Sequence, residues 1–420
     1  MIPLTSAGKK KKNFPDGSFT LSFKEGVSYM KKYEQSQLLK NLPEQFFASL
    51  VTKVNSYIER GYDVINLGQG NPDQPTPSTI IQSLQAAAEE PKNHKYSPFR
   101  GYPHLKTAIS QFYKQEYNVD LNPETEVAIL FGGKAGLVEI PLCLLNPGET
   151  VMVPDPGYPD YLSGIALAQA ETVMMPLREQ NGFLPNYKDI AEKDLEKAKL
   201  MFLNYPNNPT GAIATKEFFD ETVSLSKKHD ICVVHDFAYG AIGFDGKKPI
   251  SFLQADGAKD IGVEIYTLSK TFNMAGWRVA FAVGNSSVIS AINLYQDHLY
   301  VSLFGAIQEA AYTALTESQE SVKRMNELYE KRRNILIKGL NEIGWEVKAP
   351  EGSFFAWLKI PDGFTSQEFS DYLLETVHIA MAPGSGFGQF GEGYVRVGLL
   401  TEVDRLQEAI ERLSTLPIFK

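Results

Sequence analysis

Cysteine, histidine and long apolar runs are scarce in this sequence. Two cysteines among 420 residues cannot build a disulfide framework or a thiolate zinc site. The six histidines are scattered without ligand spacing, so we expect no metal site. No apolar stretch approaches the roughly 18–20 residues of a membrane-spanning helix, so we expect no membrane partner. Cys143 and Cys232 both lie in apolar runs, which is typical of small buried side chains in the reducing cytoplasm.

Positive charge is also in short supply. The 41 lysines and arginines against 50 acidic residues leave a net charge of −9. A chain this acidic has no electrostatic reason to bind nucleic acid. It is 43% hydrophobic and 11% aromatic, which is typical of a folded protein with a large core and excludes a disordered chain.

The first 29 residues differ in composition from the rest. A lysine run at 9–12 lacks the apolar segment that follows it in a secretory signal. Three interpretations stay open: a flexible tail, a basic tail that touches acidic surfaces, or a translated leader. Codons for residues 24–27 can contain a bacterial ribosome-binding sequence, so our hypothesis takes Met30 as the natural start.

From residue 30 onward, short apolar runs alternate with segments of helical periodicity. Several runs are continuous instead of alternating, as in parallel strands that are buried on both faces. We therefore predict an α/β fold with a large, doubly wound, mostly parallel sheet over residues 76–310. The predicted strands are 127–131, 150–153, 200–204, 231–235, 264–268 and 279–283.

The pattern changes after about residue 310. One long amphipathic helix is expected at 318–343, with Met325, Tyr329 and Ile335 on its apolar face and Gly344 as its stop. Alternating runs at 353–358, 378–382 and 394–397 and a final helix at 402–413 follow it. We predict a smaller α+β domain over 311–420, which residues 30–75 complete from the other end of the chain.

Chemically active side chains follow the predicted strands, where a parallel α/β sheet binds its ligands. Singly, each has an ordinary explanation: Asn208-Pro209-Thr210-Gly211 as a turn, Asp236 as a helix cap, Lys270 as a solvated lysine. Together they bring a carboxylate, a phenol, an amide, a lysine and an arginine to one edge. The side chains are Asn208, Asp236, Tyr239, Lys270 and Arg278.

These ordered motifs resemble the fold type I pyridoxal-phosphate aminotransferases of class I/II, over nearly all of residues 30–420. The resemblance implies a homodimeric enzyme that moves an amino group between an amino acid and a 2-oxo acid by ping-pong chemistry. It makes Lys270 the catalytic lysine that binds the cofactor covalently and shuttles the proton. Asp236 would face the pyridine nitrogen, while Tyr239 and Asn208 would hydrogen-bond the phenolic oxygen.

The remaining cofactor and substrate contacts are assigned in the same way. Phosphate would be bound by Arg278, by the first amides of a helix at Gly133, Lys134 and Ala135, and by the hydroxyls of Thr267 and Ser269, which sequence cannot rank. Tyr158 would stack on the ring, and Tyr96 would reach the phosphate of the neighbouring subunit. The substrate carboxylate would contact Arg396, Asn208 and the backbone of Gly70. The Asn208–Pro209 peptide is a candidate cis bond.

The closest resemblance is to bacterial methionine-salvage transaminases, which aminate 2-oxo-4-methylthiobutanoate. A dicarboxylic substrate would need a second cation, and only Arg100 is a candidate. Aspartate, diaminopimelate and aromatic aminotransferases share most of the motifs, and C–S lyases and decarboxylases share the fold. A ligand-sensing regulator is the non-enzyme alternative, but it would need a DNA-binding extension for which no pattern is present.

Overall fold

The computed structural model describes residues 32–300 and 302–419. The chain divides into two units, Met1–Lys40 and Asn41–Lys420. In the first unit, the described part holds a single helical turn, α1 (Gln37–Lys40). The predicted leader or tail, residues 1–29, and the proposed start at Met30 lie outside the described residues. The second unit contains everything discussed below.

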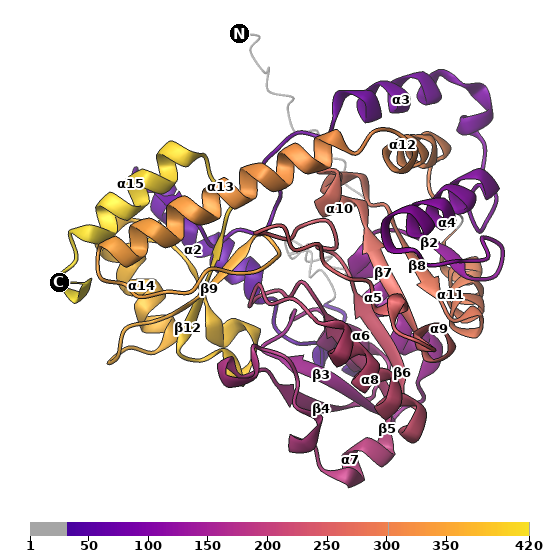
Figure 1. Cartoon of the computed structure of the whole chain (residues 1–420), viewed down its shortest axis with the longest axis horizontal. Helices are drawn as coiled ribbons and strands as arrows, with labels where there is room; N and C mark the ends of the chain where they lie inside the picture. Colours follow the sequence, from indigo (N-terminus) through magenta and orange to yellow (C-terminus); the bar gives the residue numbers. More distant parts are fainter. Residues whose placement is uncertain (1–31, 301, 420) are drawn as a thin grey trace, which may run out of the picture. The chain divides into compact units, whose positions relative to one another are not determined.

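A seven-stranded mixed sheet organises the second unit, in the order β2-β8-β7-β6-β5-β3-β4 (Figure 1). All six predicted strands are present, and the prediction of a mostly parallel sheet is confirmed. Strand β8 runs antiparallel to both of its neighbours, and the edge strand β4 was missed. The strands are β2 (Val127–Leu130), β3 (Thr150–Asp155), β4 (Glu171–Pro176), β5 (Ala198–Asn204), β6 (Cys232–Asp236), β7 (Gly262–Thr267) and β8 (Ala280–Gly284).

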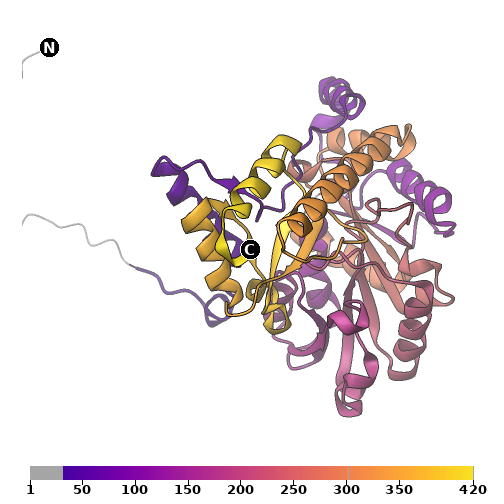
Figure 2. The ribbon, with the colours of Figure 1, turned by 60° about the vertical axis from the view of Figure 1, so that its left-hand side comes forward.

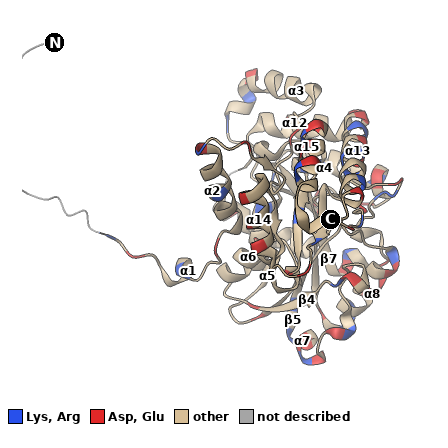
Figure 3. Ribbon diagram, turned by 90° about the vertical axis from the view of Figure 1, so that its left-hand side faces the viewer, with Lys and Arg blue, Asp and Glu red and all other residues tan. Residues whose placement is uncertain are grey.

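Helices cover both faces of this sheet because nearly every residue of its central strands is buried. One face packs against α5 (Gly133–Leu144), α6 (Tyr161–Leu167) and α11 (Ser286–Leu299). The other packs against α4 (Pro103–Tyr117), α8 (Lys216–His229), α9 (Ala258–Ile261) and α12 (Gly305–Thr316), and α3 (Ser78–Glu89) lies against α12. Charged residues recur along α8, α13 (Glu320–Glu342) and α7 (Glu192–Lys197) (Figure 3).

The remaining elements build the region that the sequence assigns to a smaller domain. Helix α13 lies beside α15 (Val403–Ser414) (Figures 1 and 2). They pack with α14 (Ser366–Val377) on an antiparallel sheet of β11 (Ala382–Pro383), β12 (Tyr394–Gly398) and β9 (Phe355–Lys359). Strand β1 (Ile65–Asn66) pairs in parallel with β10 (Ile379–Ala380), and α2 (Phe46–Glu59) packs nearby. These contacts place α2 and β1 in this region, while the domain boundaries, including those of residues 30–75, stay a prediction.

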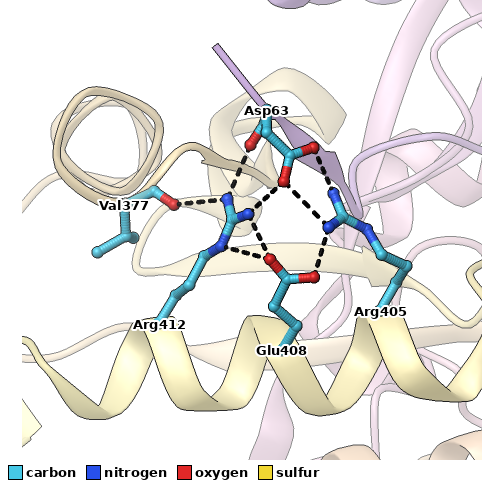
Figure 4. Close-up of polar contacts among 5 residues, drawn as sticks. All are labelled: Asp63, Val377, Arg405, Glu408 and Arg412. Carbon is cyan, nitrogen blue, oxygen red and sulfur yellow. Dashed lines mark hydrogen bonds and ion pairs between the residues drawn. The ribbon is translucent and has the colours of Figure 1, made fainter.

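An acidic side chain near β1 is bound by arginines of α15 (Figure 4). Asp63 accepts hydrogen bonds from Arg405 at 3.0 and 2.8 Å and from Arg412, and Glu408 bonds both arginines. These hydrogen bonds lower the pKa of Asp63 below its ordinary value. The cluster ties the segment before β1 to the last long helix. Within the described ranges, none of the helices is long and apolar enough to cross a membrane.

Two arginines, Arg332 and Arg333, lie on the buried face of α13, beside the expected Met325 and Tyr329. Arg332 donates two hydrogen bonds to Asp73, at 3.0 and 2.8 Å, and a third to the carbonyl of Leu399. Ile335, expected on that face, is only half-buried. Apolar periodicity therefore placed Met325 and Tyr329 correctly but missed the two arginines, because an arginine can be buried when a carboxylate pairs with it.

Loss of the Asp73 carboxylate should destabilise the fold. In Asp73→Asn, Arg332 keeps its buried charge without a good anionic partner, so we expect the free energy of unfolding to fall by about 2–3 kcal/mol. Glu402 also lies near Arg332, at 3.4 Å, but its side chain is 74% exposed. The matched control Glu402→Gln should therefore cost less than about 1 kcal/mol. Equal urea-denaturation curves for the two variants would contradict this account.

Candidate active site

A cavity of about 550 Å³ lies at the carboxyl ends of β5, β6 and β7. Its wall is built by the loops after these strands, the start of α5, the segment after β1, and residues of α2 and β12. The sequence predictions that line this wall are Gly70, Gly133, Lys134, Tyr158, Asn208, Asp236, Tyr239, Thr267, Ser269, Lys270, Arg278 and Arg396. The structure therefore brings together side chains that are spread over more than 300 residues.

Asp236, the last residue of β6, places a buried carboxylate in this wall. Burial raises the pKa of Asp236 to about 6, although a hydrogen bond from the Tyr161 hydroxyl, at 2.8 Å, opposes that rise. The sequence reading missed Tyr161, although it lies three residues after Tyr158 at the start of α6. Asp236 can thus hold or accept a proton near neutral pH.

Lys270 lies in α10 (Leu268–Thr271), the short helix that follows β7. Its Nζ donates to the carbonyl of Gly70 at 3.1 Å. Burial lowers the pKa of Lys270 to about 8; the cationic Arg396 and Arg278 act in the same direction, while Asp236 opposes them. About a tenth of this amine is therefore neutral, and nucleophilic, at pH 7, a far larger share than for a solvent-exposed lysine.

The loop after β5 turns sharply into the cavity. Its Asn208–Pro209 peptide is cis, as predicted, and so is Tyr205–Pro206. The Asn208 N–H donates to Oδ1 of Asn204 at 2.7 Å, and the Asn208 Oδ1 accepts from Arg396 at 2.9 Å. These contacts leave the Nδ2 group of Asn208 as a donor for a ligand.

Arg396 projects from β12 and is 1% exposed. Its guanidinium donates to Asn208 and, at 3.0 Å, to the carbonyl of Gly68. The same group lies 3.9 Å from the ring centroid of Phe355 and 4.7 Å from that of Phe387. Burial lowers the pKa of Arg396 to about 10. Such a desolvated planar cation, to which none of the carboxylates in residues 32–300 and 302–419 is bound, is suited to a ligand carboxylate.

A second cationic corner is formed where α5 begins. The first helical hydrogen bond of α5 runs from the Gly136 N–H to the Gly132 carbonyl, so the amides of Gly133, Lys134 and Ala135 precede the bonded turns. Arg278 is in the left-handed conformation and is held by a bond from Nη1 to the Ala275 carbonyl. Free amides beside a guanidinium make a site for a phosphate.

Four residues singled out from the sequence are placed differently from the rest. The side chain of Lys134 pairs with Asp160 at 3.0 Å, so only its amide remains for a phosphate. Ala135 does not line the cavity, and Tyr96 lies outside its wall with 88% of its surface exposed. Arg100, the candidate second cation, pairs with Asp297 and is likewise absent from the wall.

Phe47, Leu50 and Val51 of α2, together with Phe355, form an apolar part of the wall that the sequence analysis missed. Helix α2 has a clear apolar stripe, but such a stripe is typical of core packing and does not point to a ligand. Three carboxamides, Asn66, Gln69 and Asn71, also line the cavity and were missed.

Comparison with known proteins shows what such a site belongs to. Residues 62–413 match the family model "Aminotransferase class I and II". This chain is a class I and II aminotransferase. The family resemblance, the enzyme class and the fold type predicted from the sequence are therefore confirmed.

Three similar proteins show which members of the family this chain resembles. The chain is 64% identical over 388 residues to "L-glutamine--4-(methylsulfanyl)-2-oxobutanoate aminotransferase" of Bacillus subtilis (strain 168), covering 92% of this chain and 98% of that one. It is 44% identical to "LL-diaminopimelate aminotransferase" of Halothermothrix orenii, covering 92% and 99%. The solved "Substrate bound BacF structure" from Bacillus subtilis matches with a TM-score of 0.88 at 49% identity, covering 92% and 98%.

The close approach of Gly132 to Arg278 gives a test of the phosphate corner. Gly132 has φ +97°, and a Cβ there would lie 2.4 Å from Nη2 of Arg278. In Gly132→Ala we expect the affinity for pyridoxal phosphate to fall at least about tenfold, because the guanidinium must move. The matched control Gly148→Ala has a similar φ of +84° with open space around it. Fluorescence titration of the apoprotein measures both, and equal affinities would contradict this assignment.

Proposed function

We propose that this aminotransferase uses pyridoxal 5′-phosphate and forms methionine from 2-oxo-4-methylthiobutanoate, with glutamine as the amino donor. The observation that carries the proposal is the single cavity that holds Lys270, Asp236 and Arg396. The 64% identity to an enzyme named for glutamine and 4-(methylsulfanyl)-2-oxobutanoate supports the substrate pair.

The residues of the cavity fit the cofactor. When bound, pyridoxal phosphate supplies an aldehyde that captures an amine and a ring that withdraws electrons from the substrate Cα. The cavity offers Lys270, an amine with a lowered pKa, for the aldehyde and a buried carboxylate at Asp236 for the ring nitrogen. Its cationic corner, with Arg278 and the amides at the start of α5, is suited to the phosphate. The hydroxyls of Thr267 and Ser269, 2.9 Å apart, lie in the same wall.

The side chains would divide the work of the reaction as follows. Asp236 would hold a proton on the ring nitrogen, and Tyr239 and Asn208 would donate hydrogen bonds to the phenolic oxygen. Tyr158 would cover one face of the ring. Lys270 would take the proton from the substrate Cα as a base and return it as an acid.

Arg396 would bind the substrate carboxylate, together with Gly70 and Asn208. The pairing of its guanidinium with the Asn208 amide fixes its position before substrate arrives. This pre-organisation matters because a misplaced carboxylate would also misplace the Cα proton relative to Lys270. Burial strengthens the ion pair with the substrate, since less water competes for either charge.

The wall favours an uncharged substrate side chain. Its cations are Lys134, Lys270, Arg278 and Arg396. Asp160 pairs with the first, and the other three are assigned to cofactor and substrate carboxylate, so the described residues of the wall leave no cation for a distal carboxylate. Phe47, Leu50 and Val51 offer an apolar surface for a methylthio group.

The carboxamides in the wall support glutamine as the donor. The Oδ1 atom of Asn66 accepts from the Gly68 N–H, which leaves its NH₂ group unassigned. Gln69 donates to the Leu400 carbonyl at 3.1 Å, which leaves its own oxygen as an acceptor. A donor and an acceptor in one wall match the two ends of a substrate carboxamide.

We also propose a homodimer with shared active sites, in the cytoplasm. Large apolar side chains are exposed on and around α11 and α12, which is typical of a surface that another chain covers. They are Tyr96 at 88%, Phe99 at 60%, Leu294 at 58%, Leu299 at 52% and Phe304 at 45% exposure. Sedimentation equilibrium of the purified protein should give twice the chain mass of 46.8 kDa, and the single mass would contradict the dimer.

Substrate comparison tests the proposed activity. Purified holoenzyme should convert 2-oxo-4-methylthiobutanoate and glutamine to methionine with a kcat/KM at least about tenfold above that for oxaloacetate, because a buried unpaired carboxylate costs more than 1.4 kcal/mol. Aromatic acceptors and LL-diaminopimelate, the second candidate given relatives at 44% identity, complete the panel. A preference for LL-diaminopimelate, or release of ammonia and pyruvate from a sulfur amino acid, would contradict the proposal.

A further inference from the structure

A buried acid–base pair lies behind the active site, on the face of the sheet opposite to the cavity. His235 precedes Asp236 on β6, and successive side chains of a strand point to opposite faces. Nδ1 of His235 lies 2.7 Å from Oε2 of Glu264 on β7, and both side chains are 0% exposed. The chemistry proposed above uses neither residue.

Glu264 is fixed as a hydrogen-bond acceptor from four directions. Its Oε1 accepts from the hydroxyls of Tyr113, at 2.8 Å, and Ser251, at 2.7 Å. Its Oε2 accepts from the Phe252 N–H at 2.8 Å, in addition to His235. Every lone-pair direction of the carboxylate is therefore met by a donor, which is what a buried carboxylate requires.

The second nitrogen of His235 has a different partner. Nε2 lies 3.2 Å from the backbone nitrogen of Tyr205, which can only donate. Nε2 must therefore be the unprotonated acceptor, and the ring proton is on Nδ1, where it is donated to Glu264. The rings of Phe219 and Phe237, with centroids 5.1 Å from the imidazole, exclude water from this pair.

Tyr205 is the point at which the chain leaves the sheet. The pairing of β5 with β6 ends at Asn204 and Asp236, so the next N–H has passed the end of the ladder. A buried N–H without an acceptor is costly, and His235 supplies one. Three residues further on, the same turn presents Asn208 to the cavity and to Arg396.

We propose that His235, with its tautomer set by Glu264, is a positioning residue that holds the Tyr205 turn and thereby aims Asn208 at the cofactor's phenolic oxygen. The proposal rests on the proposed function, because Asn208 is given its role there. Asn204 holds the other side of the turn: it accepts from the Asn208 N–H and donates to the Asp236 carbonyl at 2.8 Å. The buried pair therefore acts on the ligand site through one backbone hydrogen bond.

A pH titration of the bound cofactor's absorbance tests this proposal. In His235→Leu, the Asn208 amide would no longer be positioned to donate its hydrogen bond to the phenolic oxygen. We therefore expect the midpoint of the absorbance change to rise by about one pH unit. KM for the amino acid should also rise, because Asn208 no longer positions Arg396. His235→Gln, which can accept from Tyr205 and donate to Glu264, should restore the wild-type midpoint.

Two further variants separate positioning from stability. Phe219→Leu removes a ring that packs on His235 and should lower the melting temperature while leaving the midpoint unchanged. Glu264→Gln places an NH₂ group beside His235, disturbs the tautomer of the imidazole, and should raise the midpoint. If His235→Leu does not fold, the Glu264→Gln variant decides whether His235 has the positioning role. Asn208→Ala should raise the midpoint, and adding His235→Leu to it should raise it no further.

The outcomes distinguish this proposal from the proposed function. If wild-type protein takes up no pyridoxal phosphate, the proposed cofactor is wrong, and this inference is overturned with it. If wild-type protein binds the cofactor but His235→Leu or Glu264→Gln keeps the wild-type midpoint, the positioning role alone is overturned. A midpoint that rises in Phe219→Leu, or that His235→Gln fails to restore, would likewise overturn it.

Discussion

The proposed chemistry of this enzyme depends on burying an acid and an amine in one cavity. Water stabilises a charge, so burial penalises the charged form of each group and moves the two pKa values toward one another. The pKa of Asp236 rises to about 6 and that of Lys270 falls to about 8. Both groups therefore exchange protons near neutral pH, where a solvent-exposed aspartate or lysine would not.

Hydrogen bonds of the backbone at the carboxyl ends of the strands hold the site residues in place. Each strand that ends there leaves an N–H or a carbonyl group without a partner in the sheet. His235 accepts the N–H of Tyr205, and Asn204 bonds the carbonyl of Asp236. Arg396 accordingly meets an Asn208 whose backbone is already held. The polar groups that end the sheet thus also shape the site.

Much of the fold could be predicted because a strand that is buried on both faces has a continuous run of apolar residues. Strands β5 to β7 are buried on both faces and read as continuous apolar runs, so their positions were predicted to within two residues. The edge strand β4 was missed because its exposed residues, among them Glu171 and Thr172, resemble a loop. The antiparallel direction of β8 could not be predicted, since an apolar run has no direction.

The residues of the candidate site likewise divide into those that the sequence predicts and those that it does not. Side chains with unusual chemistry in ordered motifs, such as Lys270 and Asp236, could be selected from sequence. The apolar wall from Phe47 and Leu50 could not, because apolar residues on a helix resemble core packing. The pairing of His235 with Glu264 joins two strands 29 residues apart, and only the register of β6 with β7 places them together.

The most direct measurement is the pH dependence of covalent attachment of pyridoxal phosphate to Lys270. Apoprotein is mixed with the cofactor at a series of pH values, trapped with borohydride and mapped by mass spectrometry. A protonated amine cannot attack the aldehyde, so the rate should rise with pH, with a midpoint near 8 and the label on Lys270 alone. Label on another lysine, or a midpoint near the ordinary lysine value of about 10.4, would contradict this account.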